Sequence, residues 1–192
     1  MKNTQISGLI FLFAISTSAM SAGVITFNGT LVDETCITTV SSTGVTAIDS
    51  PTLTLPTLAV SAFPTVNSTA GKTPFTIHLK GANCTLANPT KYATPYFVYD
   101  INKVNAQGRV INTDAATGSS VDIEILNDAN AFINLTANET SQTTSTRTVV
   151  DTDETNETNE TDFSYYARYY AKAVPVVAGP VTGTLTYNVI YK

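Results

Sequence analysis

The chain has 192 residues, of which 43% are hydrophobic and only 13% are charged, and its formal net charge is −5 at pH 7. This length and apolar content suit one globular domain and exclude a wholly disordered chain, and the acidic balance disfavours a nucleic-acid-binding protein. With one histidine, two cysteines and no tryptophan, most histidine-based metal sites and catalytic triads are excluded as well.

The first 22 residues have the pattern of a secretory signal peptide. Lys2 supplies a positive charge, residues 6–15 form an apolar run, and small residues follow up to Ala22. The apolar run is shorter than the about 20 residues that cross a bilayer. We predict cleavage after Ala22 or Ser21, with Ala19 as another possible site and a buried N-terminal helix as the alternative interpretation. The mature chain is predicted to have no transmembrane segment.

The two cysteines, Cys36 and Cys84, both lie in the predicted mature chain. An exported protein passes through an oxidising compartment, where an even number of cysteines is typical of disulfide bonding. We therefore predict a Cys36–Cys84 disulfide, and two buried free thiols are the alternative.

The mature chain is predicted to form short β-strands separated by turns. The 34 threonines of the sequence are β-branched and favour strands. Apolar and polar residues alternate in several runs, and no long stretch repeats with the 3.6-residue period of a helix. Turn residues, among them Gly179 and Gly183, separate the runs. These features predict an all-β antiparallel sandwich, with strands over residues 24–32, 75–80, 96–101, 121–126, 163–171 and 184–191.

Two longer segments are predicted to be loops. Residues 41–70 are rich in serine and threonine and contain three prolines that interrupt any long strand. Residues 138–162 are polar and end in an acidic run from Asp151 to Asp162. A calcium loop is one interpretation of this run, but its spacing does not fit an EF-hand and it lacks the glycine of that turn. We expect a solvated loop.

No arrangement of residues predicts catalysis. Asp122 and Glu124 alternate with apolar residues, so we expect both on the outer face of a strand, in contact with solvent. His78 is expected on an outer face beside Lys80. Zinc and copper sites use clusters of histidine or cysteine ligands, which this sequence does not offer. The sequence therefore predicts no enzyme activity, no metal site and no cofactor.

Three stretches resemble pilus subunits of the chaperone–usher pathway, the type 1 fimbrial protein family. In that family a tyrosine is next to last and a glycine is fourteenth from the end, and Tyr191 and Gly179 match these positions. The acidic segment before Phe163 departs from the family pattern and leaves the shape of that surface open. The resemblance is carried by residues 25–36, by residues 55–58 with 69–84, and by residues 166–171 with the C-terminal strand.

The resemblance implies an incomplete immunoglobulin-like antiparallel β-sandwich that lacks its last strand and is completed by a strand from a neighbouring subunit. It divides the chain into a signal peptide (1–22), a donor extension (23–35) and a pilin domain (36–192). In strand addition, backbone hydrogen bonds give affinity and alternate side chains give fit. The implied donor residues are Ile25, Phe27, Gly29 and Leu31, and the implied groove and chaperone contacts are Gly179, Leu185, Tyr187, Val189 and Tyr191.

The function implied by the resemblance is that of a structural fimbrial subunit that supports bacterial adhesion. The implied partners are neighbouring subunits in a head-to-tail homopolymer or mixed fibre, a periplasmic chaperone and an outer-membrane usher. The chain would pass through the periplasm to the cell surface. A different class of function is a secreted monomeric β-sandwich that binds a glycan or a protein, in which residues 23–32 form an ordinary first strand.

Overall fold

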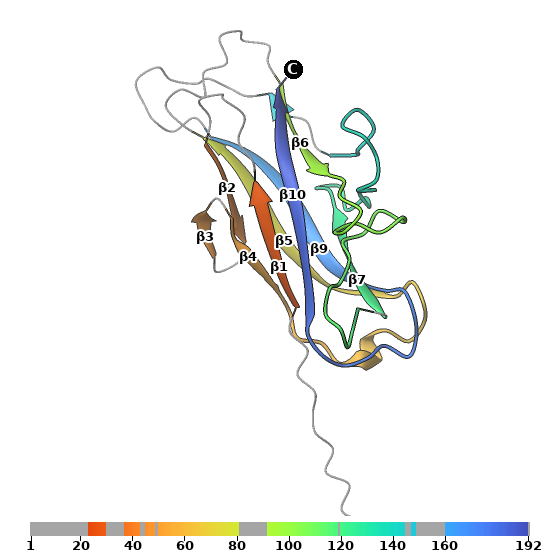
Figure 1. Cartoon of the computed structure of the whole chain (residues 1–192). Coiled ribbons are helices and arrows are strands. Elements are labelled where there is room, and N and C mark those ends of the chain that lie inside the picture. Colours follow the sequence, from red (N-terminus) through yellow and green to blue (C-terminus); the bar gives the residue numbers. More distant parts are fainter. Residues whose placement is uncertain are drawn as a thin grey trace, which may run out of the picture.

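The computed structural model describes residues 23–29, 37–42, 45–48, 50–80, 92–118, 120–144, 147–148 and 160–191. These residues form ten strands and one short 3₁₀ helix, which Figure 1 labels. The strands are β1 (Gly23–Gly29), β2 (Ile37–Ser42), β3 (Val45–Ile48), β4 (Thr52–Leu55), β5 (Thr69–Lys80), β6 (Tyr92–Val98), β7 (Val121–Leu126), β8 (Arg147–Thr148), β9 (Glu160–Ala171) and β10 (Val181–Tyr191), and the helix is η1 (Val60–Ala62).

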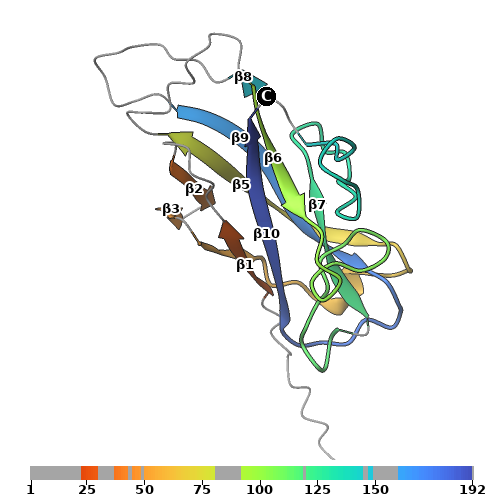
Figure 2. The same cartoon turned by 45° about the horizontal axis from the view of Figure 1, so that its top comes forward.

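The strands form two five-stranded sheets. One sheet has the order β4-β1-β10-β6-β8 and the other has the order β3-β2-β5-β9-β7. Figures 1 and 2 both show β10 and β6 of the first sheet lying in front of β5 and β9 of the second. Among the described strands every pairing is antiparallel except that of β1 with β10. The predicted all-β sandwich is confirmed.

The core lies between the two sheets and is built from alternate residues of their strands. Phe75 of β5 and Tyr165 of β9 stack with ring centroids 5.5 Å apart. Phe97 of β6 meets the same Tyr165 ring edge-on at 5.2 Å, so an aromatic contact joins one sheet to the other. Each of these three side chains is at most 1% exposed. Burial of a large side chain is worth about 1.5–3 kcal/mol, and an aromatic pair adds about 0.5–1.5 kcal/mol.

The prediction of a strand over residues 96–101 is wrong at both ends. β6 begins at Tyr92, because the long strand β10 pairs with it as far as Ala93. It ends at Val98, because the next residues form a turn around Asp100. The Asp100 carboxylate accepts the backbone N–H of Asn102 at 2.9 Å, and such an acidic side chain competes with sheet pairing.

The prediction of a loop over residues 41–70 is also wrong in part. This segment contains the end of β2, all of β3 and β4, helix η1 and the start of β5. In β4, Leu53 and Leu55 are 2% and 1% exposed while the threonines before each of them are exposed. Pro51 and Pro56 flank this four-residue strand. The prolines therefore bound a short strand rather than prevent one.

Three strands of the second sheet, β5, β7 and β9, follow the predictions closely. β7 has the predicted bounds, and β5 and β9 contain the predicted 75–80 and 163–171 and extend beyond them. Gly183, predicted as a turn residue, lies inside β10 instead. A Cβ atom at this position would lie 2.8 Å from the Val110 side chain and 3.1 Å from that of Ile123. Close packing therefore accounts for this glycine.

Candidate functional site

Strand β1 lies between β4 and β10, in a position that we call the slot. It pairs with β10 in parallel, from Gly23 opposite Val181 to Gly29 opposite Tyr187. On its other side it pairs antiparallel with all four residues of β4. The sequence segment predicted to be a donor strand thus lies inside a sheet, and Figure 1 shows it beside β10 of its own chain.

The two walls of the slot present apolar side chains to the core. On β10, Leu185 and Tyr187 are 0% and 1% exposed, and Val189 is partly buried and packs against the core cluster. The intervening residues Thr184, Thr186, Asn188 and Ile190 are half-buried. Leu53 and Leu55 supply the apolar wall on β4. The alternation that the sequence predicts for this strand is present as far as Val189.

Some predicted site residues lie outside what the structure describes. Leu31, Cys36 and Cys84 are not among the described residues, and for Tyr191 and the residues of β1 only the backbone is described. Gly179 lies in the segment that precedes β10, where its φ is 153°. A Cβ atom on Gly179 would lie 2.9 Å from the Thr117 methyl group, so this glycine allows the segment to pack against residues 112–118.

A loop that the sequence did not single out holds the first residues of β10. The Asn112 side-chain oxygen accepts the N–H of Thr182 at 3.0 Å, and the N–H of Thr113 donates to the Thr182 carbonyl at 2.8 Å. The Thr117 hydroxyl donates to the Pro180 carbonyl. These contacts fix the start of the strand that forms one wall of the slot.

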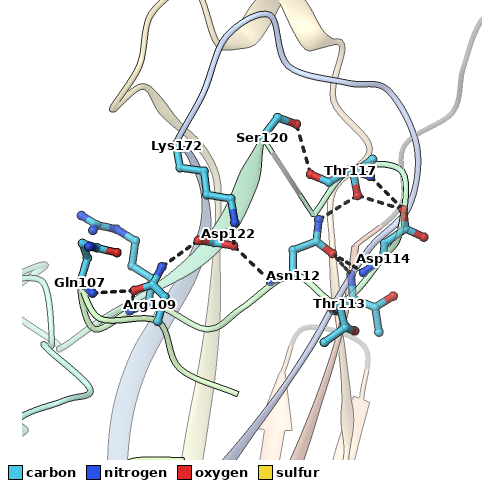
Figure 3. Close-up of polar contacts among 11 residues, drawn as sticks. Gln107, Arg109, Asn112, Thr113, Asp114, Thr117, Ser120, Asp122 and Lys172 are labelled. Carbon is cyan, nitrogen blue, oxygen red and sulfur yellow. Dashed lines mark hydrogen bonds and ion pairs between the residues drawn. The ribbon is translucent and has the colours of Figure 1, made fainter. Parts of the chain in front are cut away.

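The same loop is stabilised from within by Asp114. Its carboxylate accepts the backbone N–H groups of Thr117 and Ala116 at 3.0 and 2.9 Å, as Figure 3 shows in part. These hydrogen bonds, that of Thr117 first, hold the pKa of Asp114 below its usual value of 3.8. An aspartate two or three residues before such N–H groups is the sequence signal that could have identified this turn.

The expectation that Asp122 and Glu124 are solvated is wrong. They are 0% and 3% exposed, because residues 100–118 run beside β7 and cover its outer face. Val110 and Ile123 exchange backbone hydrogen bonds of 2.9 and 3.0 Å along this edge. A buried carboxylate is tolerated only when it is paired.

Both carboxylates have cationic partners. Arg109 and Arg168 donate to opposite oxygens of Glu124 at 2.8 and 2.7 Å. Lys172 lies 2.8 Å from Asp122, and the backbone N–H of Asn112 donates to the same carboxylate (Figure 3). The Asn105 side chain donates to its other oxygen. This network ties the loop of residues 100–118 to β7 and to the end of β9, so its role is structural.

Ser41, His78 and Asp162 form a hydrogen-bonded chain across β2, β5 and β9. The His78 Nε2 atom lies 2.6 Å from the serine Oγ, and its Nδ1 atom lies 2.6 Å from an Asp162 carboxylate oxygen. This is the order of groups in serine hydrolases. Catalysis also requires oxyanion donors and a place for substrate, whereas these three residues lie on the outer side of a sheet, and Asp162 is exposed. The chain of contacts bridges three strands.

Two neighbouring apolar cavities lie near the start of β10. Val60, Phe63 and Val176 line both of them, and Val181 lines the first. Tyr169 lines the first cavity, and its hydroxyl donates to the Pro56 carbonyl at 3.2 Å. A glycan site would present several convergent polar groups, whereas these cavities are lined mainly by apolar side chains, with Tyr169 in the first and Ser61 in the second as the residues with polar side-chain groups.

Comparison with known proteins finds similarity to fimbrial proteins, both in a family model and in individual sequences. The chain matches the family described as fimbrial protein over residues 25–192. It is 35% identical over 184 residues to the F17 fimbrial protein of Escherichia coli, covering 94% of each chain. It is 33% identical over 172 residues to the major fimbrial subunit SMF-1 of Stenotrophomonas maltophilia (strain K279a), covering 88% of this chain and 92% of the relative.

A solved structure matches at the level of fold. The P pilus rod subunit PapA superposes with a TM-score of 0.50 at 17% identity, covering 70% of this chain and 88% of PapA. Among the described residues, no helix is long and apolar enough to cross a membrane.

Proposed function

Because this chain belongs to the fimbrial protein family and is a structural subunit of a surface fimbria, we propose that its subunits join by donor-strand exchange through the slot between β4 and β10. In this arrangement the segment 23–35 of one subunit enters the slot of the next. The fibre supports adhesion of the bacterium to surfaces, in keeping with the family.

The observation that carries this proposal is the position of β1. The slot is bounded by β4 and β10, whose backbone groups pair with a seven-residue strand, and its walls carry Leu53, Leu55, Leu185 and Tyr187 on the core side. Strand addition to such an edge combines backbone hydrogen bonds with side-chain fit. Because the strand of one subunit would enter the slot of the next, the contact joins two different surfaces, so successive subunits join head to tail and the assembly grows as a filament.

The proposed partners are a chaperone and an usher, because an empty slot would make the subunit prone to aggregation. A sheet edge with apolar walls and unpaired backbone groups is prone to aggregation. A periplasmic chaperone would protect it after export, and an outer-membrane usher would deliver the subunit to the fibre. The division into signal peptide (1–22), extension (23–35) and pilin domain (36–192), and a Cys36–Cys84 disulfide, belong to the same proposal.

Other functions have less support. A secreted monomeric binding module would need a ligand site with several convergent polar groups, and the two cavities beside β10 are lined mainly by apolar side chains. An enzyme is also disfavoured, because the fimbrial family is structural and the Ser41–His78–Asp162 chain lies on the outer side of a sheet.

The test compares charges placed on alternate residues of the donor segment. By alternation, the side chain at position 27 faces the core and the side chain at position 28 faces away from it. Phe27→Asp therefore puts a charge on the core-facing side of the donor strand, and Asn28→Asp puts one on the opposite side. Each variant is expressed with its chaperone and usher genes in a bacterium without other pili, and surface fibres are counted by electron microscopy. We expect Phe27→Asp to abolish fibres and Asn28→Asp to retain them. Equal fibre numbers in both variants would contradict the proposal.

A further inference from the structure

Strand β6 lies on the side of β10 opposite to the slot, and we call the side of β6 that faces away from β10 its far edge. We propose that Gln142 and Pro95 close this far edge to strand pairing, so that a strand from a second copy adds only at the slot. The identity of the incoming strand, a donor segment, rests on the proposed function. The closure of the far edge rests on the contacts of β6 alone.

Alternate residues of β6 present their backbone groups to the far edge. In an antiparallel strand the N–H and the carbonyl of one residue point to the same side, and successive residues point to opposite sides. Both backbone groups of Phe97 bond to Gln142, a residue outside the sheet. By alternation, Pro95 and Ala93 face the same side as Phe97. An incoming strand would therefore have to pair with these three residues.

The amide side chain of Gln142 takes the place of a strand at Phe97. Its Oε1 atom accepts the Phe97 N–H at 2.9 Å, and its Nε2 atom donates to the Phe97 carbonyl at 2.7 Å. A residue on a neighbouring antiparallel strand would make the same two hydrogen bonds. Gln142 is 8% exposed and Phe97 is 0% exposed. An incoming strand would thus have to displace a buried amide group that already satisfies both backbone groups.

The other two positions of the far edge are closed in different ways. Pro95 has no backbone N–H to donate to a strand, and proline occurs within sheets where its nitrogen faces away from the ladder. Ala93 is the register partner of Arg147 in β8, so β8 already lies where a further strand would pair. At none of these described positions does the far edge offer both a free N–H and a free carbonyl.

Gln142 is held in place by the turn that contains it. Its backbone N–H donates to the Asn138 carbonyl at 3.0 Å, and its Nε2 atom also donates to the Ala137 carbonyl at 3.2 Å. The Asn138 side-chain oxygen accepts the N–H of Thr140 at 3.2 Å, which stabilises the same turn. The glutamine is therefore fixed against β6 by its own loop.

The segment of residues 127–143 also covers the edge of the second sheet. The Ile133 N–H donates to the Ile125 carbonyl of β7 at 2.9 Å. Figures 1 and 2 show this segment, in teal, beside β6 and β7. One side of the sandwich is thus closed in both sheets. The strands at the other ends of the sheets, β3 and β4, have four residues each, and a short edge strand is a poor template for pairing.

A peptide of residues 23–35 that carries p-benzoylphenylalanine at position 27 tests the closure. One variant is Gln142→Leu, which removes the amide hydrogen bonds to β6. The other combines it with Pro95→Val, which also restores a backbone N–H. The matched control is Ser141→Leu, because Ser141 is exposed in the same turn. The peptide is irradiated with each refolded mature chain, and the linked positions are mapped by mass spectrometry.

We expect the double variant to link the peptide to residues 92–98 at least tenfold more than the unaltered chain. Gln142→Leu should lie between them, and Ser141→Leu should match the unaltered chain. Equal linking to β6 in the double variant and the unaltered chain, with circular dichroism showing both folded, would overturn the proposal.

Hydrogen exchange of the unaltered mature chain gives a measurement that needs no variant. The amide of Tyr96 faces β10 by alternation, whereas that of Phe97 faces the far edge. We expect the two amides to exchange at rates within tenfold of each other, because Gln142 holds the Phe97 N–H. Exchange of Phe97 more than a hundredfold faster than that of Tyr96 would also overturn the proposal.

The outcomes separate this inference from the proposed function, because the peptide reports on the far edge of β6 whether or not fibres form through the slot. Increased linking in the double variant, together with normal fibres from Phe27→Asp, would support the closure and contradict donor-strand exchange. Unchanged linking, together with loss of fibres in Phe27→Asp, would contradict the closure and leave donor-strand exchange standing.

Discussion

Phe27 of β1 lies opposite Leu185 of β10 in a parallel register. Leu185 is fully buried, so this part of β10 forms the inner wall of the slot. The register thus places an aromatic residue of the predicted donor segment opposite a fully buried residue of the C-terminal strand. It links the first and last of the described strands, which the sequence connects only by resemblance to a family.

A charge on the inner wall of the slot should prevent capture by the chaperone. Val189 packs against the core, so Val189→Asp places an unpaired carboxylate in an apolar environment, at a cost of several kcal/mol. Ile190→Thr is the matched control on the opposite face of β10. We expect Val189→Asp to lose co-purification with the periplasmic chaperone and Ile190→Thr to retain it. The opposite order would show that the register of β10 is wrong.

Removal of Glu124 should destabilise the subunit strongly. Its carboxylate is 3% exposed and holds Arg109 and Arg168, and loss of one partner of a buried ion pair costs about 3–5 kcal/mol. We expect Glu124→Ala to lower the free energy of unfolding by this amount, measured by urea denaturation. Glu139 is exposed, and Glu139→Ala should change it by less than about 0.5 kcal/mol. Similar small effects in both variants would contradict the structural role of the network.

The sequence predicted the fold better than it predicted loop contacts. Alternation identified β7, β9 and β10 because their inward side chains meet the opposite sheet, as Leu185 and Tyr187 do. It misplaced Asp122 and Glu124 because alternation assigns a face of a strand and not what covers that face. The covering segment, residues 100–118, has no periodic pattern, and its position depends on pairings such as Val110 with Ile123.

The sequence could not predict the direction of β1 either. Alternation of apolar residues is the same for a strand read in either direction, so it identifies the segment but not whether the segment pairs parallel or antiparallel. It also does not say which chain supplies the slot. The parallel pairing of Thr26 with Thr184 is a property of the folded chain.

The cysteine variants should reveal whether Cys36 and Cys84 are bonded. The loop between them closes 84 − 36 + 1 = 49 residues, and a disulfide across it contributes roughly 4 kcal/mol. If they are bonded, Cys36→Ser, Cys84→Ser and the double variant should lose similar stability and show similarly low periplasmic yield. Two free thiols would instead give losses that add in the double variant. Thermal unfolding of the three variants distinguishes these outcomes.

The Ser41–His78–Asp162 chain should be catalytically inactive. A serine activated by histidine reacts with a fluorophosphonate, but Ser41 lies on the outer side of a sheet, where we expect no oxyanion hole. We expect no labelling of Ser41 by a fluorophosphonate probe, as judged by mass spectrometry of the digested subunit. Stoichiometric labelling that disappears in His78→Ala would show an activity that the fibre function does not require.

Photo-crosslinking within assembled fibres tests donor-strand exchange most directly. Phe27 is replaced by p-benzoylphenylalanine, and fibres are grown from a mixture of chains with natural and heavy isotopes, so that links between chains and within chains have different masses. Donor-strand exchange predicts that position 27 links to peptides from β4 or β10 of a different chain. Links from position 27 to β10 of the same chain alone, in fibres of normal length, would contradict it.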